Sequence, residues 1–319
     1  MRALVTGAAG FVGSHLAERL VAEGHAVIAV DCLTDYYDPG QKRSNLDALA
    51  RLPDCDIARV DLRGADLGPL VAAADVVFHQ AGQPGVRASW SDGFAPYVEH
   101  NVLATQRLLE AVKGADVRRF VYASSSSVYG NATSYPTDEE DVPRPQSPYG
   151  VTKLAAEHLC GVYARSWGVP TVALRYFTVY GPRQRPDMAM HRLIEAAMAG
   201  TSFPLYGDGR QIRDFTYVDD VVEANLLAAA ADVVPGSVMN IAGGTAMSLL
   251  DVVDIVGDLV GRPVRLDRRP AQAGDVERTG GSSRRAAEVL GWRSRVRLPE
   301  GLPEQVRWHA GRVRSEALA

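Results

Sequence analysis

The fold is decided by the stretch at residues 3–13, which reads ALVTGAAGFVG. Its first three residues form an apolar run, which is typical of a strand buried on both faces of a sheet. Three glycines follow at a spacing of three, Gly7, Gly10 and Gly13, and a helical pattern continues through Leu16 and Leu20. In this order, the backbone can approach a pyrophosphate, and the helix N-terminus offers N–H groups and a positive dipole end to it. The stretch therefore predicts a dinucleotide site, with a chance glycine-rich turn as the alternative.

The next strand patterns predict which dinucleotide is bound. The apolar run at residues 26–30 ends at Asp31. A carboxylate there accepts hydrogen bonds from an adenosine ribose and repels a 2′-phosphate, which favours NAD over NADP, although Lys42 and Arg43 leave the choice open. Asp61, after the strand pattern at 57–60, is expected near the adenine amino group, with a turn-starting aspartate as the alternative. Small residues after the strand pattern at 75–79 suit a passing cofactor.

Strand and helix patterns alternate as far as residue 177. A helix is expected from Asn101 to Val112, with Asn101 at its start, and strands at 120–123 and 171–176. The alternation predicts an α/β fold with a Rossmann-type doubly wound parallel sheet. Beyond it a smaller mixed α/β substrate-binding domain is expected. We assign residues 1–177, with a return segment at about 213–242, to the first domain and residues 178–212 and 243–319 to the second.

A second motif lies at residues 147–153, SPYGVTK. Pro148 suits the first position of a helix, with Ser147 as its N-cap. Tyr149 and Lys153 are then four residues apart on one helix face. An ammonium near a phenol stabilises the phenolate and lowers its pKa, so the pair is able to remove a proton from a sugar hydroxyl. The alternative is an ordinary tyrosine and lysine on a solvated helix.

Composition bounds the class of protein. The chain has 319 residues, of which 46% are hydrophobic and 23% charged, and a net charge of −4 without a basic block. Binding to nucleic acid or to an anionic membrane therefore has no electrostatic support. The three cysteines are scattered without metal-type spacing, so no metal site is expected. We expect them to be reduced thiols in a cytoplasmic protein. No signal peptide and no membrane-spanning run are visible.

Three motifs in this order resemble the extended short-chain dehydrogenase/reductase family: the glycine turn, the run Ser124–Gly130 and Tyr149-x-x-x-Lys153. The resemblance covers essentially the whole chain. It narrows to the nucleotide-sugar epimerases, and among them to the UDP-glucuronate 4-epimerases. The narrowing stretches are DYYD at 35–38, QPGVR at 83–87, FTVYGPRQRPDM at 177–188, GDG at 207–209 and RDFTY at 213–217.

The resemblance implies roles for single residues. Ser125 matches the catalytic hydroxyl, with Ser126 as runner-up because four consecutive serines blur the register. Tyr149 matches the general base and Lys153 its partner. The implied NAD contacts are Gly7, Gly10, Phe11, Val12, Gly13, Asp31, Asp61, Leu62, Gln80, Ala81, Gly82, Asn101, Tyr149, Lys153 and Tyr176. The implied UDP-sugar contacts are Arg87, Ser126, Thr178, Arg185, Arg192, Arg213 and Asp275.

The expected reaction is 4-epimerisation of a UDP-hexuronate by transient C4 oxidation. Arg185, together with Thr178, is expected to hold the sugar carboxylate, and Arg87 is a second candidate, because a planar guanidinium fixes orientation as well as charge. Related dehydratases and decarboxylases carry a glutamate where this chain has Ser127, so those reactions are disfavoured. A further departure is Gln272, where many relatives have a diphosphate-binding arginine.

Three rivals stay open: a UDP-glucose/UDP-galactose 4-epimerase, a decarboxylating enzyme and a non-catalytic NAD sensor. A homodimer is expected from the family.

Overall fold

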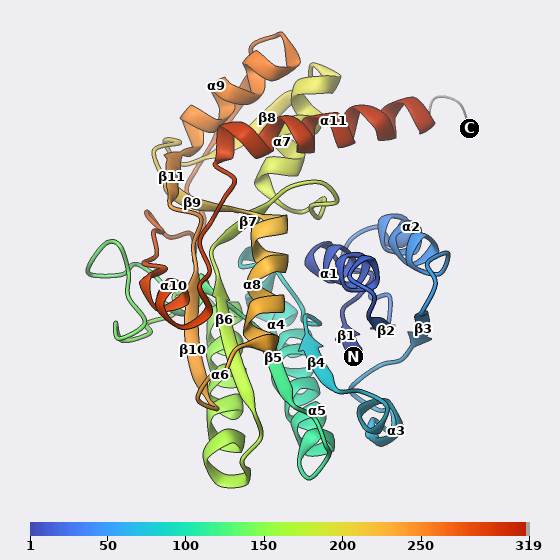
Figure 1. The fold of residues 1–319 in the computed structure, drawn as a ribbon. Coiled ribbons are helices and arrows are strands. Elements are labelled where there is room, and N and C mark those ends of the chain that lie inside the picture. The colour runs from blue at the N-terminus through green and yellow to red at the C-terminus, as the bar shows by residue number, and fades with distance from the viewer. Residues whose placement is uncertain (317–319) are drawn as a thin grey trace.

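The structure is a computed structural model that describes residues 1–316 (Figure 1). Its centre is a parallel sheet in the order β10-β6-β5-β4-β1-β2-β3. This confirms the predicted doubly wound sheet and its returning last strand. The strands are β1 (Arg2–Thr6), β2 (Ala26–Asp31), β3 (Cys55–Arg59), β4 (Val76–His79), β5 (Arg119–Ser125), β6 (Thr171–Tyr176) and β10 (Ser237–Ile241).

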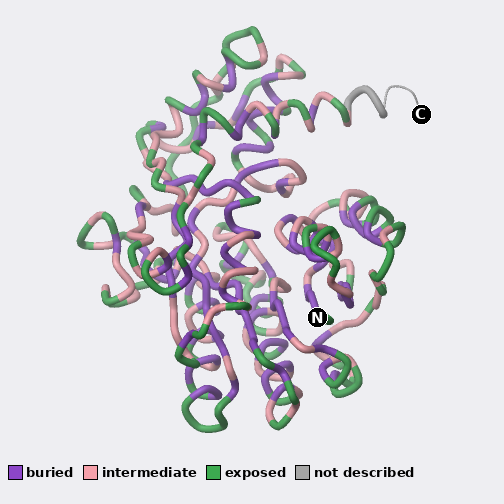
Figure 2. Tube along the Cα trace, viewed as in Figure 1, coloured by how far each residue is buried: buried purple, intermediate pink, exposed green. Residues whose placement is uncertain are grey.

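Helices cover both faces of this sheet because successive strand side chains point to opposite sides. Ala3 and Val5 pack into one buried cluster, and Leu4 between them packs into another. The strands are accordingly buried along most of their length (Figure 2). The first face is covered by α1 (Phe11–Ala22), α2 (Pro39–Leu49), α8 (Val218–Ala230) and α10 (Arg284–Leu290), the second by α3 (Gly68–Ala72), α5 (Ala104–Val112) and α6 (Pro148–Trp167).

A second unit lies beyond the carboxyl ends of the sheet strands, at the top of Figure 1. It has its own buried cluster, to which Leu193, Val252 and Leu302 belong. Its two small sheets have the orders β11-β9-β7 and β12-β8. Its elements are β7 (Thr178–Tyr180), α7 (Ala189–Ala199), β8 (Ser202–Tyr206), β9 (Ile212–Tyr217), β11 (Thr245–Ser248), α9 (Leu249–Val260), β12 (Arg265–Arg269) and α11 (Leu298–Glu316).

The predicted helix start at Asn101 is wrong. Short 3₁₀ turns at Arg87–Ser89 and Ser91–Gly93 lead into α4 (Phe94–Tyr97), which continues through the π-helical turn Val98–Leu103 into α5. Asn101 therefore lies inside a helical run and caps nothing. A π-turn adds one residue to a helical turn, and such turns occur frequently at functional sites.

Part of the C-terminal segment packs against the large sheet. Ala286 and Trp292 belong to the core of that sheet. The loop after Trp292 is held by the buried carboxylate of Asp220. One oxygen of this carboxylate accepts hydrogen bonds from Arg295 N and Val296 N, both at 3.1 Å. The division into two domains stays our proposal; by packing, residues 284–292 go with the large sheet, and β9 goes with the second unit.

Candidate active site

A cavity of about 720 Å³ separates the carboxyl ends of the sheet strands from the second unit. This is the place where open α/β sheets bind their ligands. Every predicted cofactor and substrate residue except Asn101 lines it. The motifs singled out in the sequence, although far apart along the chain, thus converge on one site.

Two positions of the glycine turn require glycine, because a side chain there would collide with the backbone. Gly7 has φ +69°, and a Cβ added there would lie 2.7 Å from Ala81 N. A Cβ on Gly13 would lie 2.1 Å from Gly7 O. The start of α1 lines the cavity behind this turn. The absence of side chains and the helix N-terminus suit a dinucleotide pyrophosphate, so the residues fit the cofactor that the sequence predicts.

Asp31 holds the turn in place from the end of β2. One carboxylate oxygen accepts a hydrogen bond from Ala9 N at 3.1 Å, and the other accepts one from Leu33 N at 2.7 Å. The same side chain borders the cavity, as a ribose contact requires. Asp61 lies at the end of β3, where hydrogen bonds from Arg63 lower the pKa of its carboxyl to about 2.

The start of α6 is built as predicted. Ser147 Oγ accepts a hydrogen bond from Gly150 N at 3.1 Å, and Pro148 is the first helical residue. This N-cap fixes the first turn, so Tyr149 and Lys153 both border the cavity. Lys153 Nζ donates to Ala123 O at 2.9 Å, which ties the helix to the end of β5. Burial lowers the pKa of Lys153 to about 8, and the charge of Arg185 adds to this.

The electrostatics of Tyr149 differ from the sequence expectation. Tyr149 is half-buried on the cavity wall, and desolvation raises its pKa above the ordinary value of a phenol. A hydrogen bond with Ser125 and the charge of Arg185 oppose this rise. The charge that lowers the pKa of Tyr149 comes from Arg185, on the other side of the cavity. Lys153 Nζ, on the same helix as Tyr149, donates to Ala123 O.

The serine run separates into distinct roles. Ser124 Oγ donates to Glu157 Oε2 at 2.6 Å in the core, away from the reacting group. Ser125 bonds Tyr149 and also accepts from Ser127 N at 3.1 Å, at the start of the 3₁₀ turn Ser126–Val128. Ser126 borders the cavity without that bond. The geometry thus favours Ser125 over Ser126 as the hydroxyl partner of Tyr149.

Two of the predicted substrate arginines already hold carboxylates. Arg185 Nε and Nη2 donate to the two oxygens of Asp187 at 2.9 and 3.1 Å. Arg87 does the same with Asp275, at 3.3 and 2.7 Å, and its guanidinium lies 4.1 Å from the centre of the Tyr206 ring. Thr178, Arg192 and Arg213 complete the predicted substrate set around the cavity. An anionic ligand therefore meets arginines whose charge is partly compensated.

Asn101, a predicted cofactor contact, lies behind the lining of the cavity. Its Oδ1 accepts from Gln83 N at 2.7 Å, and its Nδ2 donates to Gln83 O and Thr152 Oγ1, both at 3.0 Å. Asn101 is buried and is not among the described residues that line the cavity. Since its side chain is already committed, it holds the loop after β4 against α6 rather than facing a ligand.

Sequence reasoning missed several cavity residues. Tyr36, Tyr37 and Asp187 line the cavity, and all three lie in stretches that carried the family resemblance without being given a role. The Arg185-x-Asp187 spacing was the available signal for the pair.

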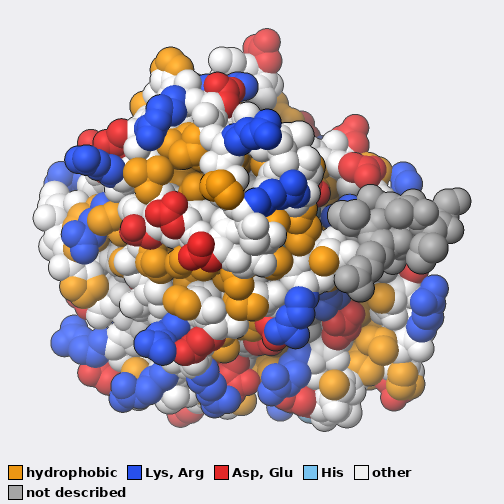
Figure 3. Space-filling view, turned by 90° about the horizontal axis from the view of Figure 1, so that it is seen from above, with side chains coloured by type: hydrophobic (Ala, Val, Ile, Leu, Met, Phe, Trp, Pro, Cys, Tyr) orange, Lys and Arg blue, Asp and Glu red, His pale blue; other side chains and the backbone are white. Residues whose placement is uncertain are grey.

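On the face seen from above, basic and acidic side chains are interspersed with hydrophobic ones (Figure 3). Among the described residues visible on this face, charges of one sign form no block of the kind that binds a phosphate backbone. Among residues 1–316, no helix has the length and apolar character needed to cross a membrane.

A Rossmann sheet whose glycine turn and Tyr–Lys helix open onto one cavity defines a dinucleotide-dependent enzyme. The chain belongs to the NAD dependent epimerase/dehydratase family, which matches residues 3–242. It is 42% identical to an uncharacterized UDP-glucose epimerase of Bacillus subtilis, over 96% of this chain and 97% of that protein. It is 36% identical to a probable UDP-glucuronate 4-epimerase of Rhizobium meliloti, over 97% of each.

Among solved structures, the chain is similar to the UDP-glucuronic acid 4-epimerase of Bacillus cereus in complex with UDP-glucuronic acid and NAD. The TM-score is 0.95 at 39% identity, covering 98% of this chain and 99% of that one.

Proposed function

We propose that this protein is an NAD-dependent 4-epimerase that interconverts UDP-glucuronate and UDP-galacturonate. The observation that carries this proposal is the meeting of three groups in one cavity: Ser125 bonded to Tyr149, the field of Arg185 on that phenol, and the glycine turn. The similarity to the Bacillus cereus enzyme, solved with UDP-glucuronic acid and NAD, supports the same substrate and cofactor.

In the proposed reaction the chain moves one proton. Tyr149, as phenolate, accepts the proton of the C4 hydroxyl at its Oη, and Ser125 donates a hydrogen bond to the C4 oxygen. The glycine turn would hold NAD, which when bound would supply a reversible hydride acceptor for C4. After inversion Tyr149 gives the proton back to the same C4 oxygen, so that protons and electrons balance and nothing is consumed. Lys153 and Arg185 contribute positive charge around the phenolate.

A uronate adds a requirement that a neutral sugar does not have. Its 4-keto form is a β-keto acid, which loses carbon dioxide when the carboxylate turns out of the carbonyl plane. Arg185 is the candidate to hold that carboxylate, with Thr178 beside it on the cavity wall. Because Nε and Nη2 of Arg185 already bind Asp187, the substrate carboxylate has to share the guanidinium or displace Asp187.

The proposal is tested with a panel of UDP-glucuronate, UDP-glucose and UDP-N-acetylglucosamine, with the products separated by chromatography. We expect UDP-galacturonate from UDP-glucuronate without release of a UDP-pentose. A deuterium at C4 should stay at C4, since the hydride returns to the same carbon. Turnover of UDP-glucose alone, or a UDP-pentose as the main product, would refute the proposal.

Arg185→Ala sharpens this test. We expect at least a tenfold loss of UDP-glucuronate turnover, or release of a UDP-pentose, because the carboxylate loses its planar partner. Arg210→Ala is the matched control, since Arg210 is exposed and outside the cavity. Unchanged kinetics and product purity in Arg185→Ala would remove this role from Arg185.

The specific rival is a UDP-glucose/UDP-galactose 4-epimerase. The Arg185–Asp187 pair favours it, because a neutral C6 hydroxyl would leave the pair intact. The name of the Bacillus subtilis relative points the same way. In that case Arg185→Ala would change UDP-glucose turnover little, and the panel would show no uronate product.

We further propose a cytoplasmic homodimer. Val151 and Val162 are exposed on one face of α6, and Trp167 at its end is exposed as well. Burying such a face against a second copy is favourable. The three free cysteines suit a reducing compartment. Light scattering on the eluted protein tests the dimer, and Val162→Glu should shift it toward monomer if α6 forms the interface.

A further inference from the structure

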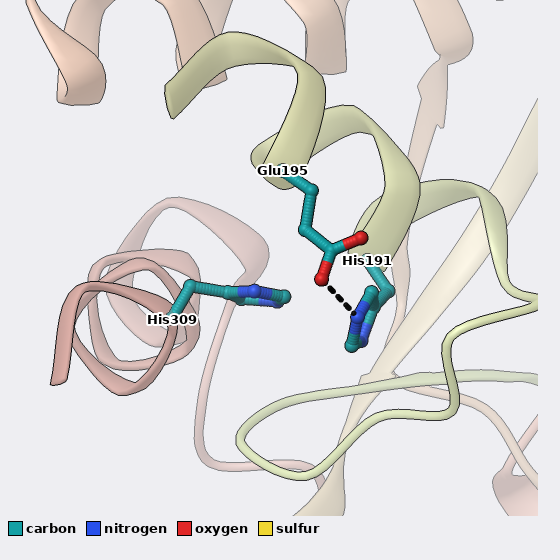
Figure 4. A group of neighbouring side chains, drawn as sticks. All are labelled: His191, Glu195 and His309. Carbon is teal, nitrogen blue, oxygen red and sulfur yellow. Dashed lines mark hydrogen bonds and ion pairs between the residues drawn. The ribbon is translucent and has the colours of Figure 1, made fainter. Parts of the chain in front are cut away.

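A group of three potential ligand residues lies outside the cavity, between α7 and α11. His191 and Glu195 are four residues apart on α7, and His309 faces them from α11 (Figure 4). One nitrogen or oxygen atom from each of these side chains lies within 4.8 Å of the others. None of the three lines the cavity, so the proposed reaction leaves them unexplained.

The hydrogen bonds of His191 fix which ring nitrogen is available. Its Nδ1 lies 2.7 Å from Gln184 O. A backbone carbonyl only accepts, so Nδ1 carries the proton and donates. In the neutral ring, Nε2 then presents a lone pair, and it faces Glu195 Oε1 at 2.9 Å. Two acceptors at this distance require a positive centre, which is either a proton on Nε2, making an imidazolium paired with Glu195, or a bound cation.

His309 provides the independent observation. The residue is only 2% exposed, and among the described residues its Nε2 has no hydrogen-bond partner. A buried polar atom without a partner costs stability and needs an explanation. The ring points toward the other two side chains (Figure 4), and the centres of the two imidazole rings are 4.4 Å apart. An ion at the centre of the group would satisfy this atom.

We propose that His191, Glu195 and His309 bind one divalent transition-metal ion of the zinc type. Two imidazoles and a carboxylate are the donors that zinc prefers, whereas magnesium and calcium take oxygen donors. A tetrahedral ion at about 2.1 Å from each ligand atom places these atoms roughly 3.4 Å apart, which small side-chain rotations achieve. The Glu195 side chain is 53% exposed, which gives the ion an entry path and its fourth position a water.

The surroundings of the site explain what the ion would do. The Gln184 carbonyl orients His191 in the way that outer-shell carbonyls orient ligating histidines. The side chain of Gln184 accepts a hydrogen bond from Gln305 Nε2 of α11 at 2.9 Å, and both glutamines are buried. Gln184 also directly precedes Arg185. The ion would therefore join α7, α11 and the loop that carries the proposed carboxylate-binding arginine.

The test uses tag-free full-length protein that has been treated with a chelator and dialysed. Zinc chloride is titrated by calorimetry, with magnesium chloride in parallel, and bound metal is counted by mass spectrometry. We expect one zinc per chain with a Kd of 1 µM or below, no magnesium binding, and a thermal midpoint that rises with zinc concentration. Absence of zinc binding up to 100 µM would overturn the proposal.

Variants locate the site. Glu195→Gln keeps the size of a half-exposed side chain and should weaken zinc binding at least tenfold, as should His309→Gln. His25→Gln, at the turn before β2, is the control and should bind like the original protein. Should His309→Gln fail to fold, Glu195→Gln still decides, because equal zinc affinity in that variant refutes the assignment. All readouts are independent of epimerase activity, so this proposal and the proposed function fail separately.

Discussion

The two sides of the cavity use charge in opposite ways. On the sheet side, the strong ion pair is hidden: Arg175 and Glu157, with side chains 5% and 4% exposed, bind each other in the core behind the serine run. Where the sheet domain faces the second unit, a pair stands on the cavity wall: Arg87, from the turn before α4, binds Asp275, and the two side chains are 42% and 28% exposed. A ligand cannot reach the first pair and has to compete with the second.

This difference has a physical consequence for each side. A buried pair holds its geometry because removing one partner leaves an uncompensated charge in a medium of low dielectric constant. A half-exposed pair contributes little to stability and exchanges partners at small cost. The sheet side is therefore built to keep the reacting groups fixed, and the other side to accept an anionic ligand.

The largest expected effect tests the fixed side directly. Tyr149→Phe should lower kcat by about 10²–10⁴-fold, because the proposed proton acceptor is lost while the ring stays in place. Binding of the UDP-sugar, measured by calorimetry, should persist. Tyr163→Phe, on the same helix but bonded to Gln106 rather than facing the cavity, is the control. Epimerisation by Tyr149→Phe at the original rate would end the proposed chemistry.

The buried pair gives the next effect, on stability. Glu157 accepts hydrogen bonds from Arg175 Nε at 3.0 Å and from Arg175 Nη2 at 2.6 Å. Glu157→Gln leaves the guanidinium uncompensated, and we expect a loss of about 3–5 kcal/mol in the free energy of unfolding, measured with urea. The contrast is Asp267→Asn, which breaks the exposed pair with Arg269 and should cost far less, because solvent screens exposed charges. Equal losses in the two variants would erase the distinction between buried and exposed pairs.

The free energy of unfolding should depend on pH through the buried carboxyl of Asp214. Burial raises the pKa of Asp214 to about 6, although N–H groups of Gly281 and Gly244 donate to its carboxylate. Between the unfolded value near 4 and this folded value, the folded state binds more protons. The stabilisation from the protonated form is thus fully present below pH 4 and lost as the pH rises through 6, by about 3 kcal/mol.

This pH effect is measured as the difference in unfolding free energy between the original protein and Asp214→Asn, at several values from pH 4 to 7. The difference should fall with rising pH, since the asparagine does not titrate in this range. Parallel curves would show that Asp214 has the same pKa in both states.

The sheet side could be predicted from the sequence because its signals are local. Buried parallel strands read as continuous apolar runs, so the run at 26–30 appears as β2. The N-cap Ser147 and Pro148 act within one helical turn, and the structure confirms both. Asp31, Asp61 and Gln80 were predicted from strand ends, which meet at one edge of a parallel sheet, and all three line the cavity; the substrate residues were implied by the family resemblance.

What could not be predicted depends on partners far along the chain. Asn101 suggests a cap in isolation, but its amide is taken by Gln83 and Thr152 across two other elements. The position of α10 depends on Asp220 holding the loop that follows it. Likewise, His191 and Glu195 are a visible pair in the sequence, whereas His309 joins them only through the packing of α11 on α7.

The smallest expected effect tests the exchangeable side. Asp275→Asn keeps a polar side chain for a nucleotide but removes the charge that holds Arg87 Nη2 at 2.7 Å. We expect the KM for the UDP-sugar to fall about two- to fivefold, which corresponds to the roughly 0.5–1 kcal/mol that a half-exposed pair contributes. The fall should shrink at high salt, because screening weakens the original pair as well. Asp267→Asn, outside the cavity, should leave KM unchanged. A rise in KM would mean that the Asp275 carboxylate itself binds the ligand, and that this wall is as fixed as the sheet side.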